Sequence, residues 1–164
     1  MSTTQAESGR AERTRIEGPS IVKSVNWHFT SKCNYRCTFC YQGNLDGDLT
    51  SLANARAVLK DLQRLGIDKI NFVGGEPFCH PLIIDLIVLA KEIGFTTSVT
   101  TNGSLVTEEK LERLRNSLDW MGISVDSGSE IIEKELGRGN GAHVANAIRL
   151  AGLVRQYGIK LKIN

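Results

Sequence analysis

From residue 20 onward, short apolar runs of the chain alternate with longer amphipathic segments. The short runs predict β-strands at about 21–29, 68–73, 95–101, 120–126 and 158–163. The longer segments predict helices at about 51–65, 81–93, 107–117 and 142–157. Strand and helix alternate throughout, which is typical of βαβ units built around a parallel sheet. We therefore expect an α/β fold with about five parallel strands.

The ends of the predicted helices carry the residues expected at such positions. Thr107 precedes two glutamates, which places a capping hydroxyl and two acids at a helix start. Gly66, Gly94 and Gly158 follow predicted helices, where a residue in the left-handed conformation is favoured. These signals support the expected helix boundaries.

Side chains alternate between the two faces of a strand, and each predicted strand has one apolar and one polar face. The polar positions are Ser24, Asn26, His28, Lys69, Asn71, Ser98, Thr100, Asn102, Ser124, Asp126, Lys160, Lys162 and Asn164. Helices are expected to cover the apolar face. A dry, unpaired polar interior would be costly, so the pattern favours a curved sheet whose concave side holds a polar, anionic ligand. The alternative is a sheet with one solvated face, which is unusual for parallel strands.

Length and charge narrow the class of protein. The chain has 164 residues, enough for one packed domain, and its formal charge of 20 − 18 = +2 excludes a generic nucleic-acid binder without excluding a local anion site. Residues 1–19 are polar and are expected to form a disordered tail before a core at 20–164. Neither a secretory signal nor an apolar run of membrane-spanning length is present, so we expect a cytoplasmic protein that binds no membrane.

The four cysteines suggest a metal or redox site in a reducing compartment. Cys33, Cys37 and Cys40 have the spacing C-x3-C-x2-C directly after the first strand. Three thiolates can hold three corners of a 4Fe–4S cluster and leave one iron open. The alternatives are zinc, with a fourth ligand from Cys79 or a histidine, and unligated thiols.

Three further residues are given ordinary structural interpretations from the sequence. Cys79, taken alone, is expected to be a small buried hydrophobic residue. His80 and His143 are expected at the surface. These three residues are therefore left outside the predicted site. If the bound metal were zinc, the candidates for its fourth ligand would be Cys79, His28 and His80.

The cysteine motif, with Phe39 before its last cysteine, and Gly74-Gly75-Glu76-Pro77 after the second strand together resemble the radical S-adenosylmethionine superfamily. Within it, six segments resemble the viperin-like nucleotide dehydratases: 26–30, 69–72, 101–105, 123–127, 137–139 and 162–164. The resemblance covers roughly residues 24–164. It implies a partial (β/α) barrel of the TIM type, containing the N-terminal part of the radical SAM core.

The resemblance also implies a reaction. The open iron of the 4Fe–4S cluster chelates S-adenosylmethionine, and one electron from a donor such as flavodoxin or ferredoxin cleaves it to a 5′-deoxyadenosyl radical. In viperin-like enzymes this radical removes the 4′ hydrogen of a nucleoside triphosphate, expected here to be CTP, UTP or GTP. Loss of the 3′ hydroxyl as water gives the antiviral 3′-deoxy-3′,4′-didehydro nucleotide.

Site residues follow from the resemblance together with the strand faces. The cluster ligands are Cys33, Cys37 and Cys40. The residues expected at the cofactor are Phe39, Gly74, Gly75, Glu76, Asn102, Ser124 and Arg138. The residues expected at the substrate are Asn26, His28, Lys69, Lys162 and Asn164. Phe39 is expected to stack near the adenine or to pack on the cluster, and no residue is assigned a catalytic role.

The chain departs from this family in two respects. It lacks the amphipathic membrane helix of vertebrate viperins, and it stops in the fifth predicted strand, where family members continue. We expect a C-terminally truncated core with an exposed sheet edge and weak or no turnover on its own. Two other functions stay open: another radical SAM enzyme that modifies peptides or activates a protein, and a non-catalytic metal-binding fragment.

Overall fold

The computed structural model describes residues 23–41 and 46–164; the tail expected at 1–19 lies outside the described residues. Five strands form one parallel sheet in the order β1-β2-β3-β4-β5. They are β1 (Ser24–Thr30), β2 (Lys69–Gly74), β3 (Thr96–Thr101), β4 (Trp120–Ile123) and β5 (Lys160–Ile163). The predicted α/β class with five parallel strands is therefore confirmed.

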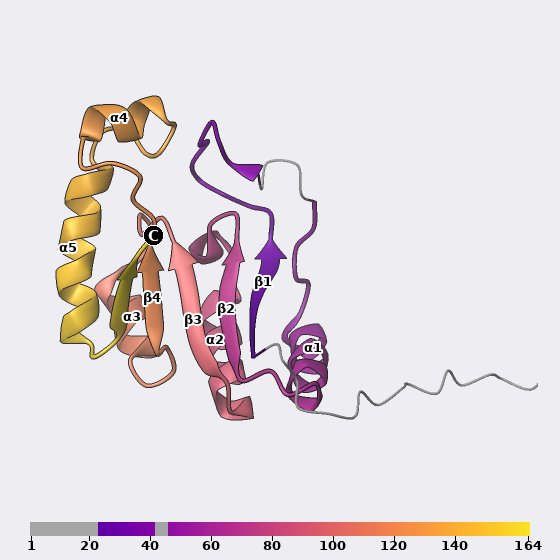
Figure 1. The fold of residues 1–164 in the computed structure, drawn as a ribbon. Helices are drawn as coiled ribbons and strands as arrows, with labels where there is room; N and C mark the ends of the chain where they lie inside the picture. Colours follow the sequence, from indigo (N-terminus) through magenta and orange to yellow (C-terminus); the bar gives the residue numbers. More distant parts are fainter. Residues whose placement is uncertain (1–22, 42–45) are drawn as a thin grey trace, which may run out of the picture.

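The helices lie on one side of the sheet and at its carboxyl end. They are α1 (Leu52–Arg64), the short 3₁₀ helix η2 (Pro77–Cys79), α2 (Ile83–Ile93), α3 (Glu108–Leu114), α4 (Glu130–Glu135) and α5 (His143–Gln156). In Figure 1, α2 and α3 lie behind the sheet, α5 lies beside β5, and α4 stands beyond the carboxyl ends of the strands. In the part of the chain that the structure describes, no helix is long and apolar enough to cross a membrane.

The hydrophobic core lies between the sheet and these helices. Ile70, Phe72, Val99, Met121 and Ile123, from the predicted apolar faces of three central strands, are fully buried. The helices contribute Leu59, Leu86, Leu111 and Leu150, which are also fully buried. Each such side chain contributes about 1.5–3 kcal/mol when removed from water. Helices therefore cover the apolar face, as the alternation predicted, and leave the polar face open.

Several element ends match their sequence signals. The Thr107 hydroxyl accepts a hydrogen bond from Lys110 N and begins α3. Gly94 ends α2 in the left-handed conformation (φ 108°). The Gly66 and Gly158 backbones also have positive φ, in the turns after α1 and α5. Glycine is suited to these turns because a Cβ disfavours that conformation.

The end of the fourth strand and one helix differ from the prediction. The fourth strand ends at Ile123 and not at 126, because the backbone N–H groups of Asp126 and Ser127 are bonded to the Glu133 carboxylate instead of to a neighbouring strand. That carboxylate belongs to α4, which the sequence did not predict. Six residues between glycine-containing turns are too few to give a recognisable helical period.

Candidate functional site

The cysteine loop, residues 31–41, follows β1 beyond the carboxyl edge of the sheet (Figure 1). Cys33 and Cys37 are partly buried and Cys40 is exposed. Burial, together with the charges of Glu76 and Cys40, raises the pKa of the Cys33 thiol, although Tyr35 N–H donates to its sulfur at 3.4 Å. Burial also raises the pKa of the Cys37 thiol, against the Arg138 charge and reinforced by Cys33 and Cys40. The thiols of Cys33, Cys37 and Cys40 therefore lie close enough together on the loop for their charges to interact.

Gly74 and Gly75 pack directly against the chain that enters this loop. A Cβ on Gly75 would lie 2.1 Å from the carbonyl oxygen of Lys32, and one on Gly74 would lie 2.3 Å from that of Thr30. The close approach is held by hydrogen bonds from Gly75 N to Thr30 O (2.9 Å) and from Glu76 N to Lys32 O (2.7 Å). Glycine is required here because any side chain would displace the loop. The expected contact of these glycines with a cofactor stays a prediction.

Glu76 is an internal anchor at the end of β2, with only 1% of its surface exposed. Its Oε1 accepts hydrogen bonds from Phe78 N (3.0 Å) and the Thr101 hydroxyl (2.7 Å), and its Oε2 accepts one from Asn102 N (2.7 Å). Burial raises the pKa of this carboxyl in spite of these donors. Glu76 therefore joins β2 to the end of β3.

The end of β3 is in turn bonded to the cysteine loop. The side-chain amide of Asn102 donates to the Asn34 carbonyl oxygen at 2.9 Å, and the Asn34 amide donates to the Ser104 hydroxyl at 2.8 Å. Asn102 also accepts hydrogen bonds from the backbone and hydroxyl of Ser104. Asn34 was not singled out in the sequence, although it lies inside the cysteine motif. Asn102 is thus placed beside the predicted cluster ligands.

Arg138 contacts the other side of the loop. Its guanidinium forms an ion pair with Asp126, lies 3.3 Å from a carboxylate oxygen of Glu133, and is centred 5.6 Å from the Phe39 ring. A Cβ on the preceding residue, Gly137, would lie 2.1 Å from the carbonyl oxygen of Arg36. Arg138 and Phe39, both predicted at the cofactor, are therefore brought together. Two carboxylates already pair with the arginine.

Two histidines that were expected at the surface from the sequence are buried. His80 and His143 are 5% and 1% exposed, so the expectation that they lie at the surface is wrong. His80 Nε2 lies 2.9 Å from Leu49 O, and His143 Nε2 lies 2.8 Å from Ser124 O. Each buried ring has a hydrogen-bond partner, because its Nε2 lies close to a backbone carbonyl oxygen of another segment. Ser124, predicted at the cofactor, is thereby held at the end of β4.

Cys79 is not the fully buried residue that was expected, because its side chain is partly exposed. Its sulfur lies 3.9 Å from the Asn34 side-chain oxygen. Burial raises the pKa of its thiol, and the charges of Glu76 and Cys33 add to that increase. Cys79 therefore lies beside the loop that carries the other three cysteines.

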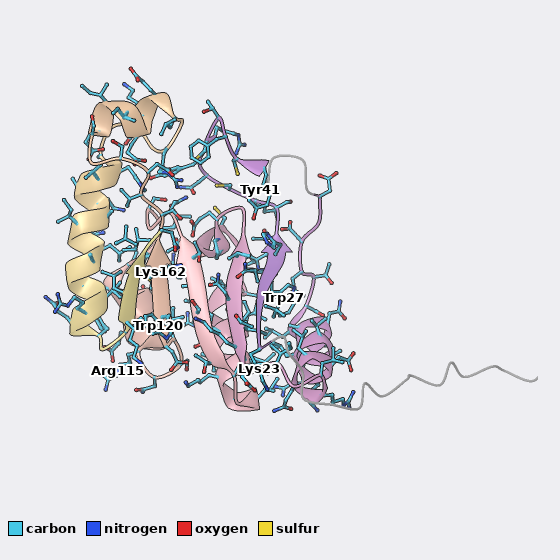
Figure 2. All side chains as sticks on the ribbon, viewed as in Figure 1. Lys23, Trp27, Tyr41, Arg115, Trp120 and Lys162 are labelled. Carbon is cyan, nitrogen blue, oxygen red and sulfur yellow. The ribbon has the colours of Figure 1, made fainter. Side chains whose placement is uncertain are left out.

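The open polar face of the sheet forms a groove of about 190 Å³. Its lining residues are Ser24, Asn26, Lys69, Asn71, Ser98, Thr100, Trp120, Gly122, Lys162 and Asn164. Four of the five predicted substrate residues line it; His28 does not, and its ring instead packs 6.1 Å from that of Tyr41. Figure 2 places Trp120 and Lys162 on the β4–β5 side of this face. The groove therefore gathers the polar positions that strand alternation predicted.

Amide side chains and lysines make the groove polar and positively charged. Asn71 donates to Asn26 at 3.0 Å and to the Thr100 hydroxyl at 3.2 Å, which links three strands. The ammonium groups of Lys69 and Lys160 lie 5.5 and 5.2 Å from the Trp120 ring. Within residues 23–41 and 46–164, the ion pairs found include no carboxylate for Lys69, Lys160 or Lys162. Among the described residues, no carboxylate therefore compensates the positive charge that these three lysines bring to the groove.

The cysteine loop presents three thiols, the number that a 4Fe–4S cluster with one open iron would take. Among the described residues, no group of three His, Cys, Asp or Glu side chains is arranged to hold a metal ion. A cubane is larger and takes its thiolates at separate iron corners. Three thiols on one loop, with an N–H group donating to Cys33, match that requirement. Cys33, Cys37 and Cys40 would hold such a cluster.

Comparison with known proteins identifies the class to which this chain belongs. Residues 27–164 match the model of the Radical SAM superfamily. The chain belongs to this superfamily, whose members use a 4Fe–4S cluster and S-adenosylmethionine. The predicted cofactors and the resemblance stated from the motifs are thereby confirmed.

More specific similarity comes from curated relatives called S-adenosylmethionine-dependent nucleotide dehydratase. One from Thermoplasmatales archaeon (strain ISO4-H5) is 38% identical over 87% of this chain and 51% of its own length. One from Flammeovirga pacifica is 35% identical over 91% of this chain and 55% of its own length. The chain therefore spans about half the length of these relatives.

Solved structures share the fold at lower identity. Streptococcus suis SuiB bound to S-adenosylmethionine has a TM-score of 0.77 and 22% identity over 88% of this chain and 34% of its own. The anSMEcpe enzyme with bound AdoMet has a TM-score of 0.68 and 21% identity over 87% of this chain and 42% of its own. This likeness supports the radical SAM fold and carries no information on the substrate.

Proposed function

We propose that this chain is the catalytic core of a nucleotide dehydratase that cleaves S-adenosylmethionine and dehydrates a nucleoside triphosphate to its 3′-deoxy-3′,4′-didehydro form. The similarity to curated nucleotide dehydratases over most of the chain supports this proposal. The observation that carries it is the groove: three lysines, without carboxylate partners among the described residues, lie on or beside a wall of amide and hydroxyl groups. Such a wall suits a polyanion that also carries hydrogen-bonding sugar and base groups.

The residues of the groove divide into two roles. Lys69 and Lys162 would bind the phosphates, with Lys160 beside them, because ammonium groups form strong charge-assisted hydrogen bonds with phosphate oxygens. Asn26 and Asn164 would contact the ribose or the base. His28 is exposed outside the groove, and its proposed contact would need a substrate that reaches beyond it.

The residues at the carboxyl edge would bind the cofactors. Cys33, Cys37 and Cys40 would hold the cluster, which together with S-adenosylmethionine supplies a reductively generated 5′-deoxyadenosyl radical. Asn102, Ser124 and Arg138 would contact S-adenosylmethionine, Phe39 would pack beside it, and Gly74, Gly75 and Glu76 would line its amino end. An electron donor such as flavodoxin or ferredoxin would supply the electron.

The test is nucleotide binding and conversion by the anaerobically reconstituted chain. Lys69→Gln and Lys162→Gln should each weaken CTP, UTP or GTP binding by about tenfold or more, because each removes a charge-assisted phosphate contact. Lys60→Gln, at an exposed position on α1, is the matched control and should bind as wild type does. With the remaining half of a relative supplied in trans, mass spectrometry should detect the dehydrated nucleotide together with 5′-deoxyadenosine.

Two outcomes would contradict the proposal. If neither lysine substitution changes nucleotide affinity, the groove does not hold a triphosphate, and a radical SAM enzyme acting on a peptide becomes the better interpretation. If S-adenosylmethionine is cleaved while every nucleotide is left unchanged, even with the remaining half of a relative supplied in trans, the dehydratase assignment fails.

A further inference from the structure

Glu133, on α4, has none of its surface exposed. Its Oε1 accepts hydrogen bonds from the backbone N–H groups of Asp126 (2.7 Å) and Ser127 (2.5 Å). Two residues separate these amides from the end of β4, where the chain leaves the sheet. Glu133 therefore fixes the segment that connects β4 to α4.

The second oxygen of this carboxylate faces a positive charge. Glu133 Oε2 accepts no hydrogen bond from the described residues and lies 3.3 Å from Arg138 Nε and 3.9 Å from His143 Nε2. A fully buried carboxylate is costly unless an opposite charge compensates it. Arg138, only 8% exposed, is the fixed cation among these neighbours. The two side chains therefore hold each other in place.

Arg138 connects Glu133 to the cysteine loop. Its guanidinium is centred 5.6 Å from the ring of Phe39, which lies between Cys37 and Cys40. The end of α4 is joined to the same half of the loop by hydrogen bonds from Arg36 N to Gly137 O (3.3 Å) and from Thr38 N to Leu136 O (3.0 Å). One run of contacts thus leads from Glu133 to the predicted cluster ligands.

We propose that Glu133 is a positioning residue of the cofactor site: it holds Arg138 against Phe39 and so fixes the Cys37–Cys40 half of the loop relative to the end of β4. The proposal rests on the assignment of the loop as the cluster site. Asp126 also pairs with Arg138 and accepts a hydrogen bond from its Nε, but 35% of the Asp126 side chain is exposed, so solvent screens that pair. Glu133 is the buried partner.

Amide hydrogen exchange on the full chain without cofactors tests the proposal directly. Glu133→Gln keeps the side-chain shape and one acceptor oxygen for the backbone amides but removes the charge that faces Arg138. It should speed exchange at Arg36 and Thr38 by about tenfold, as expected when a buried charge-assisted contact is lost. Glu135→Gln, at an exposed position on the same helix, is the control and should leave exchange unchanged.

Amide exchange in the central strands distinguishes a positioning role of Glu133 from a general loss of stability. Exchange at Phe72 and Val99 should stay as in wild type, because these residues lie in β2 and β3 away from α4. If Glu133→Gln speeds exchange equally there, or leaves Arg36 and Thr38 unchanged, the proposal is overturned. If that variant does not fold, Arg138→Lys replaces the planar guanidinium and should loosen the same two amides. Unchanged amides in Arg138→Lys would then reject the proposal.

A second measurement uses the loaded protein. After anaerobic reconstitution and reduction with dithionite, Glu133→Gln should hold the cluster and give an electron paramagnetic resonance spectrum that S-adenosylmethionine changes less than in wild type. A response equal to that of wild type would contradict the proposal. Failure of wild type to form any cluster would instead refute the proposed function, whereas the exchange experiment would still decide whether Glu133 orders the loop.

Discussion

At the scale of single residues, glycine determines how closely other segments approach the cysteine loop. Gly75, after β2, leaves no room for a Cβ beside Lys32 O, and Gly137, after α4, leaves none beside Arg36 O. Gly139 is also confined, because a Cβ there would lie 3.1 Å from the Tyr35 hydroxyl. The loop is therefore packed from two sides by backbone that leaves no room for a side chain.

Gly137→Ala should destabilise the protein and displace the loop. The new methyl would overlap Arg36 O at 2.1 Å, and the backbone has φ +80°, which disfavours a residue with a Cβ. We expect a loss of about 2–4 kcal/mol in the free energy of unfolding, combining overpacking with backbone strain. Urea unfolding measures the loss, and iron bound per chain after reconstitution should fall with it.

Gly152→Ala is the matched control for that substitution. Gly152 lies within α5 and has no positive φ, and no atom of the described residues outside its own helical turn lies within 4 Å of the place that a methyl group would take. Alanine should stabilise the helix by about 0.5–1 kcal/mol and leave iron binding unchanged. A Gly137→Ala protein as stable and as iron-rich as this control would show that the loop is not tightly packed against α4.

Glu76 should make stability depend on pH. Burial raises the pKa of its carboxyl in the folded chain. The folded state therefore holds the proton more tightly than the unfolded state, and this stabilisation is complete below the unfolded pKa of about 4.3 and is lost as pH rises through the folded pKa. Glu76→Gln does not titrate, and should lack this fall in stability when urea unfolding is followed from pH 4 to 8.

Glu76→Gln should also carry a cost at low pH. Its amide N–H group would face Asn102 N, which now donates to Oε2 at 2.7 Å, and two opposed donors cost about 1–3 kcal/mol. Curves of unfolding free energy against pH that run parallel for the two proteins would contradict the role of Glu76 as a buried, titrating anchor.

At the scale of elements, the sheet and the helices that cover it follow from hydrophobic period, whereas the elements around the site do not. Ala55 and Leu59, four positions apart on α1, are both buried, as the helical period of an amphipathic segment requires. By contrast, α4 is six residues long and owes its position to polar contacts of Glu133 and Arg138. Contacts between charged groups far apart in sequence leave no periodic signal, so this element was missed.

An ion pair also joins α2 to the amino end of β4, at the edge of the sheet opposite to the cysteine loop. Lys91 Nζ lies 2.7 Å from an Asp119 oxygen, and the Asp119 carboxylate accepts a hydrogen bond from Thr97 N at 2.8 Å. Burial by itself raises the pKa of Asp119, but the donors Lys91 and Thr97 outweigh it and lower the pKa below its ordinary value. This contribution to stability is present above the unfolded pKa of about 3.9 and is lost as pH falls through the folded pKa.

Asp119→Asn should therefore lower the free energy of unfolding by about 1 kcal/mol at pH 7, a value reduced for the partial exposure of the pair. The difference from wild type should shrink as pH falls below about 4. Asp85→Asn, which removes an exposed pair with Arg113, is the control and should change stability by less than about 0.5 kcal/mol. Equal effects of the two substitutions in urea unfolding would contradict the assignment.

At the scale of the whole molecule, the sequence was enough to predict the sheet and the groove. Alternation in each strand placed Asn26, Lys69, Lys162 and Asn164 on one face, and the structure gathers them there. Alternation fixes the face of a strand and not how far a groove extends along it, so it did not show that His28, on the same exposed face as Asn26, lies outside the groove. Nor did it reveal Trp120, since a large aromatic residue on a polar face has no distinctive pattern.

The central claim is that three cysteines on one loop hold a cubane with one iron open to S-adenosylmethionine. Mössbauer spectroscopy of the anaerobically reconstituted chain, enriched in ⁵⁷Fe, tests it most directly. We expect about four iron atoms per chain, with the signal of one iron changing when S-adenosylmethionine is added. A protein that retains only zinc at these thiols, or a cluster whose four irons are unaffected by S-adenosylmethionine, would contradict it.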